Sequence, residues 1–68
     1  MNYNIEYLLR YVSNDTYKKI LKNKSNYILS LVEDNYTDTD LNIKYLIKYG
    51  VKNIDKVVYD SLEDLTIS

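Results

Sequence analysis

Apolar residues recur along the chain at the spacing of a helix. In the first such segment the i, i+3, i+4, i+7 pattern of one apolar stripe is formed by Ile5, Leu8, Leu9 and Val12. Three later segments keep the same period, so the pattern predicts helices over about residues 3–12, 16–33, 40–49 and 54–65. We therefore expect an all-α fold for residues 1–68, a single domain of two αα-hairpins packed as a small four-helix bundle.

Polar residues and a glycine mark the predicted helix ends. Residues 34–40 are polar and have no period, so they are expected to form the main loop. Lys24 falls on the apolar side of the helix predicted over 16–33, which indicates a kink, a division of the helix or a snorkelling lysine. Gly50, the only glycine, predicts a left-handed stop after the third helix, and Asn53 is expected to cap the fourth.

An internal match links the first and third predicted helices. Residues 4–11 and 42–49 align without a gap, with Asn, Ile, Tyr, Leu and Tyr identical. A duplication and a biased composition would both account for the match. In either case the two segments are expected to have the same pattern of faces.

Both of these helices carry a second apolar face. At about 100° per residue, one set of residues lies opposite the Ile/Leu/Val stripe, which in the third helix consists of Ile43, Leu46 and Ile47. The set consists of Tyr3, Tyr7 and Tyr11 in the first helix and Leu41, Tyr45 and Tyr49 in the third. Two interpretations are open: the tyrosines belong to the core of the bundle, or they are exposed and form an interface.

The small size of the domain favours an interface. A chain of this length buries only about 60% of the surface that its unfolded form would expose. Without Cys or His it also lacks disulfides and the usual zinc ligands. Tyrosine combines a large contact area with a polar tip and is enriched at interface centres. The candidate protein-interaction residues are therefore Tyr7, Tyr11, Tyr45 and Tyr49, which would bind a protein partner or a second copy of the chain in a homodimer.

Residue types needed for catalysis are scarce. Without His or Cys the chain lacks the common general base near neutral pH and the thiol nucleophile, and one glycine cannot build a phosphate loop. Residues 38–42 imitate the start of a calcium loop, but Ile43 stands where glycine is needed and Tyr49 where a bidentate glutamate belongs. We expect no enzyme activity, catalytic residue, metal, cofactor or small-molecule substrate.

Lysines of the second predicted helix raise nucleic-acid binding as an alternative. The net charge of −1 provides no global basic field, and the helix after Gly50, in the outline of a helix-turn-helix, is acidic. A local basic block is nevertheless present. The alternative function is therefore a nucleic-acid-binding dimer, such as a transcriptional regulator, that uses Lys18, Lys19, Lys22 and Lys24.

Composition suggests where such a protein acts. No leader-like segment and no apolar run of about 20 residues is present, so we expect a cytoplasmic protein without a membrane span, in the host cytoplasm if it is viral. The richness in Asn, Lys, Ile and Tyr, without Pro or Ala, is typical of A/T-rich genomes. The leading hypothesis is a small, non-enzymatic, protein-binding regulator or inhibitor encoded by a phage or mobile element.

Overall fold

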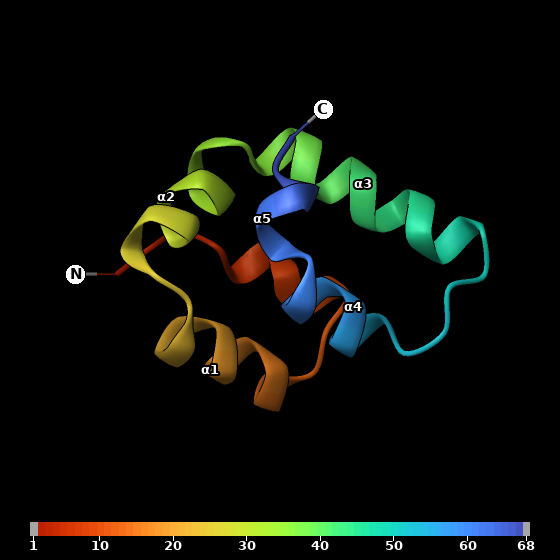
Figure 1. The fold of residues 1–68 in the computed structure, drawn as a ribbon, viewed down its shortest axis with the longest axis horizontal. Helices are drawn as coiled ribbons and strands as arrows, with labels where there is room; N and C mark the ends of the chain where they lie inside the picture. Colours follow the sequence, from red (N-terminus) through yellow and green to blue (C-terminus); the bar gives the residue numbers. More distant parts are fainter. Residues whose placement is uncertain (1, 68) are drawn as a thin grey trace.

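The computed structural model describes residues 2–67, and all regular structure in this range is helical (Figure 1). A short 3-10 helix precedes five α-helices. The elements are η1 (Glu6–Arg10), α1 (Asn14–Asn23), α2 (Asn26–Asp34), α3 (Tyr36–Lys48), α4 (Ile54–Asp60) and α5 (Leu62–Leu65). This arrangement confirms the all-α fold class and the small helical bundle.

The first segment is a 3-10 helix rather than the α-helix predicted over 3–12. Its turns are closed by short-range hydrogen bonds, such as those from the amides of Leu8 and Tyr11 to the carbonyls of Ile5 and Leu8, at 3.1 and 2.9 Å. This first segment ends at Ser13, which has an extended backbone and is the N-cap of α1. So short a segment is marginal as an α-helix, and its aromatic and β-branched residues weaken α-helix propensity further.

The helix predicted over 16–33 is divided at Lys24, one of the possibilities its polarity raised. Lys24 has an extended backbone, and the Ser25 side chain then caps α2 by accepting a hydrogen bond from the Ile28 amide at 3.2 Å. The segment predicted over 54–65 is likewise divided, at Ser61, into α4 and α5. The bundle therefore consists of shorter helices than the period alone predicted.

The loop predicted over 34–40 is wrong, because α3 already begins at Tyr36 and only Asn35 separates it from α2. The polar residues of this stretch lie on a helix. Thr39 is fully buried, and its hydroxyl donates to the Asn35 carbonyl at 2.8 Å, so its polar atom is satisfied inside the helix.

The predicted helix signals around Gly50 and Asn53 are confirmed. Gly50 has a φ of 80°, its amide donates to the Ile47 carbonyl, and the Val51 amide donates to the Leu46 carbonyl, each at 3.0 Å. These two bonds form a Schellman ending for α3. Asn53 adopts the left-handed region at φ 55° and its side chain accepts the Lys56 amide, so it caps α4.

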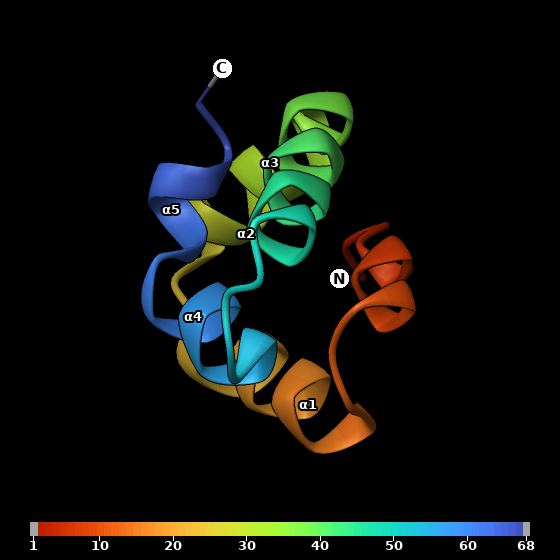
Figure 2. The same cartoon turned by 90° about the vertical axis from the view of Figure 1, so that its right-hand side faces the viewer.

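Every element contributes to a single core. In Figure 1, α4 and α5 cross the middle of the molecule between α3 and α1, and Figure 2 shows η1 on the side away from α5. The core consists of Ile5, Leu8, Val12, Ile20, Leu29, Val32, Ile43, Val58, Leu62 and Leu65. Most of these residues lie in the predicted apolar stripes, and together they leave the outer side of α3 uncovered.

Candidate protein-interaction surface

The four candidate tyrosines are divided between the core and the surface. Tyr7 and Tyr11 are half-buried and pack against the core, whereas Tyr45 and Tyr49 are 54% and 75% exposed. The structure therefore does not bring the four together as one surface. Tyr7 and Tyr11 fit the interpretation as core residues, whereas Tyr45 and Tyr49 are exposed.

Tyr7 joins η1 to the end of α2. Its hydroxyl donates to the Val32 carbonyl at 2.6 Å, and its ring meets Tyr36 edge-on with centroids 6.4 Å apart. Burial raises the pKa of Tyr7 to about 12, because the charged phenolate would lose its hydration there. The hydroxyl and the ring of Tyr7 therefore both contact other residues of this chain.

Tyr11 belongs to a charged cluster that joins η1 to α3. Its hydroxyl donates to Asp40 Oδ1 at 2.5 Å, and this carboxylate also faces Arg10 Nη1 at 3.6 Å and Lys44 Nζ at 3.2 Å. Burial alone would raise the pKa of Asp40, but the hydrogen bond from Tyr11 and the two cations outweigh it and lower the pKa. Sequence reasoning placed Asp40 at a loop end. Its spacing of four residues from Lys44 was the signal that could have identified the pair.

The raised pKa values of Tyr7 and Tyr11 predict a loss of stability in alkali. Burial, and for Tyr11 also the neighbouring Asp40 charge, raises each pKa from 10.0 to about 12 in the folded protein. A raised folded-state pKa means that the stabilisation is complete below pH 10 and is lost as the pH rises toward about 12. We expect the free energy of unfolding, measured with denaturant at several pH values, to fall across this window. The Tyr7→Phe/Tyr11→Phe variant should show a shallower fall, and an equal slope would contradict the assignment.

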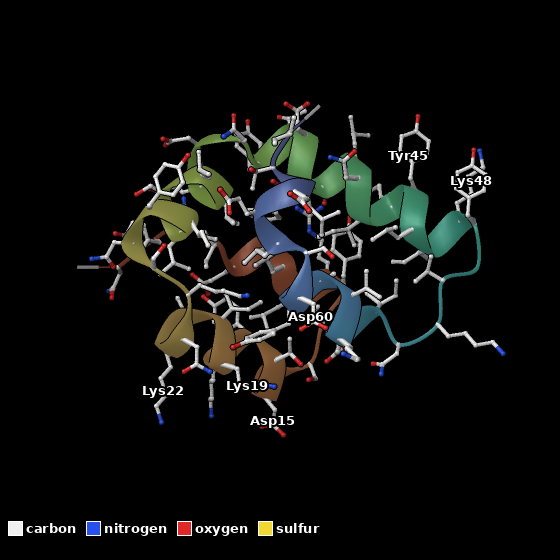
Figure 3. The ribbon with its side chains drawn as sticks, viewed as in Figure 1. Asp15, Lys19, Lys22, Tyr45, Lys48 and Asp60 are labelled. Atoms are coloured by element: carbon white, nitrogen blue, oxygen red, sulfur yellow. The ribbon has the colours of Figure 1, made fainter. Side chains whose placement is uncertain are left out.

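The outer side of α3 carries the exposed pair. Leu41, Tyr45 and Tyr49 stand at i, i+4 and i+8 and are 47%, 54% and 75% exposed. The rings of Tyr45 and Tyr49 stack with centroids 6.3 Å apart and planes 19° from parallel. In Figure 3 Tyr45 and Lys48 point away from the body of the molecule. We call Leu41, Tyr45, Lys48 and Tyr49 the α3 outer face.

The candidate lysines do not form one free basic patch. Lys18, Lys19 and Lys22 are exposed on α1, but Lys24 is half-buried in the break before α2. The ammonium groups of Lys19 and Lys24 lie 4.6 and 4.1 Å from the centroid of the Tyr59 ring, so both are directed toward α4. An acidic group also accompanies them, since Asp15 projects from α1 beside Lys19 in Figure 3.

Asp55 has a role that sequence reasoning missed. It accepts hydrogen bonds from the Ser13 amide at 2.9 Å, the Ser13 hydroxyl at 2.6 Å and the Thr16 hydroxyl at 2.8 Å. These hydrogen bonds lower the pKa of Asp55, and those from Ser13 have the largest effect. The carboxylate therefore ties the start of α4 to the start of α1, a long-range contact for which the sequence offers no periodic signal.

The remaining surface offers hollows without a reactive cluster. One of them lies between the N-terminal segment, α1 and α2, has a volume of about 410 Å³, and is lined in part by Tyr3, Glu6 and Tyr17. Within residues 2–67 no group of carboxylates is arranged to hold a metal ion. None of the helices in that range has both the length and the apolar character needed to cross a bilayer.

Comparison with protein families, with curated proteins and with solved structures finds no match to this chain. The α3 outer face therefore has to be interpreted from its own geometry and chemistry.

Proposed function

We propose that this chain is a small protein-binding regulator or inhibitor that docks through the α3 outer face. The observation that carries the proposal is the stacked pair Tyr45 and Tyr49, more than half exposed beside Leu41. Their role differs from that of Tyr7 and Tyr11, which pack inside the protein. A phage or mobile-element origin stays a prediction from composition.

The physical argument rests on what such a pair contributes when it is covered. Each tyrosine can bury about 150–250 Å², and mutual stacking of Tyr45 and Tyr49 already restricts their side chains before a partner arrives. Less side-chain entropy is then lost on binding. Tyrosine is also among the residue types that dominate binding energy at interface centres. While the two rings remain exposed to water, they contribute less favourable free energy than when a partner covers them.

A photo-crosslinking amino acid at position 45 tests the docking surface. We expect the benzophenone derivative of phenylalanine at this position to give a discrete protein adduct in cells that express the chain. Tyr49→Glu in the same chain should reduce that adduct at least about tenfold, because loss of a hot-spot tyrosine weakens binding by about 2 kcal/mol or more.

Position 36 supplies the matched control. Tyr36 is 59% exposed, similar to Tyr45, but its ring packs against Tyr7 of η1, away from the α3 outer face. The same crosslinker at position 36 should not give the adduct. Equal adducts from both positions, or an adduct from position 45 that Tyr49→Glu leaves unchanged, would contradict the proposal.

A further inference from the structure

The charges at the two ends of α3 are of opposite sign and have no partners within the described chain. Asp38 lies in its first turn and Lys48 in its last turn. The ion pairs formed in residues 2–67 involve neither of these two side chains. Acids at the start and bases at the end of a helix suit its dipole. They also give the α3 outer face a charge pattern that an inverted copy of itself complements.

We propose that the partner of the α3 outer face is a second copy of this chain, with the two α3 helices packed antiparallel about a two-fold axis. This inference rests on the proposed function, because it identifies the occupant of the same face. A two-fold contact uses one surface twice and therefore closes at the dimer.

The residue spacing along α3 fits this arrangement. A two-fold axis at the level of Ile43 places Leu41 of one copy beside Tyr45 of the other and Asp38 beside Lys48, because each pair is symmetric about that level. A parallel arrangement would instead place Asp38 beside Asp38 and Lys48 beside Lys48, and like charges would repel.

The C-terminal segment extends the apolar part of this face. The Asn42 side-chain amide donates to the carbonyls of Leu65 and Ile67 at 2.8 and 2.9 Å, so the segment lies against α3. Ile67 is itself exposed. A chain of this size buries little core of its own, and association with a second copy is a common way to increase burial.

The available area predicts a reversible dimer. Stable interfaces bury about 800 Å² per partner, which is about a sixth of the 4636 Å² accessible surface of this chain. One side of a 13-residue helix about 20 Å long, extended by Ile67, is smaller than that. We expect a dissociation constant in the micromolar range, measurable by sedimentation equilibrium up to millimolar protein.

Charge reversal at Asp38 and Lys48 tests the antiparallel arrangement. At low salt, Asp38→Lys and Lys48→Asp should each weaken dimerisation about tenfold, because each change turns two attractions per dimer into repulsions. The Asp38→Lys/Lys48→Asp variant should recover the wild-type dissociation constant within about threefold. Lys18→Asp, on exposed α1, should leave dimerisation unchanged, and circular dichroism should show that every variant keeps its helicity.

The outcomes separate this inference from the proposed function. A double variant no tighter than the single variants would overturn the antiparallel pairing. A wild-type chain that stays monomeric at millimolar concentration would overturn the second copy as partner, and an adduct of another mass from position 45 would then leave the proposed function standing. A monomer that retains a single-stranded oligonucleotide, and loses this retention in Tyr45→Ala/Tyr49→Ala, would also overturn the second copy as partner. That result would indicate that the two tyrosines stack on bases.

Discussion

Replacing Ile43 with alanine is expected to lower the free energy of unfolding by about 2–5 kcal/mol, as for other buried aliphatic residues cut back to alanine. Ile43 has no exposed surface and is the α3 residue of the hydrophobic core. Natural domains are stable by about 0.05–0.15 kcal/mol per residue, or about 3–10 kcal/mol for a chain of this length. The loss should therefore be a large part of the total stability, and urea denaturation followed by circular dichroism would measure it.

Ile47 offers the matched control one turn along the same helix. It has the same side chain, but 46% of its surface is exposed, so Ile47→Ala should cost about 1 kcal/mol or less. If both changes cost the same, the inner side of α3 would be assigned incorrectly. The comparison separates burial from helix propensity, because the substitution is identical in the two variants.

The same two residues show what the hydrophobic period could predict. The pattern placed Ile43, Leu46 and Ile47 together on one stripe, yet Ile43 is buried, Leu46 half-buried and Ile47 nearly half exposed. A period of 3.6 residues fixes the direction of a stripe. It contains no information on how much of the stripe other elements cover, which depends on where η1 and α5 pack.

Helix boundaries were harder to predict, for two physical reasons. A polar stretch is typical of a loop and equally of the outer side of a helix, so residues 34–40 were assigned to a loop although α3 begins at Tyr36. The polarity of Lys24 raised a division of the helix as one of three possibilities, and the division depends on Ser25, whose capping bond competes with a continuous helix. The hydrophobic period does not decide between these alternatives, whereas the cap at Asn53 and the stop at Gly50 have local signals and were predicted.

The candidate tyrosines are exposed in only one of the two matching segments, because the two segments adopt different helices. Residues 4–11 and 42–49 share their tyrosine spacing, but the first forms η1 and the second lies in α3. A 3-10 turn has three residues, so side chains four apart no longer align as they do in an α-helix. Tyr7 and Tyr11 are accordingly directed to different partners, Val32 and Asp40, while Tyr45 and Tyr49 stack on one another.

Removal of the Asp40 carboxylate is expected to cost about 2–3 kcal/mol of unfolding free energy. Only 14% of this side chain is exposed, and Asp40→Ala would leave the Tyr11 hydroxyl without its acceptor. The change would also separate Arg10 and Lys44 from their common counter-ion. Hydrogen bonds to charged groups contribute about 1.5–3 kcal/mol, and a donor left unsatisfied adds its desolvation cost. Asp34→Ala, at an exposed position that forms no ion pair within residues 2–67, should change stability by about 0.5 kcal/mol or less.

The pH dependence of this loss distinguishes the charge of Asp40 from the volume of its side chain. The pKa of Asp40 is lowered from 3.8 in the folded protein, so its stabilisation is present above that value and is lost as the pH falls through the folded-state pKa. The difference in stability between wild type and Asp40→Ala should therefore narrow in acid. Asp55 also has a lowered pKa, but it is present in both proteins and its contribution cancels in the difference. A difference that stays constant from neutral pH to below about pH 3 would show that Asp40 acts by packing, and η1 would then be held to α3 by contacts other than the carboxylate.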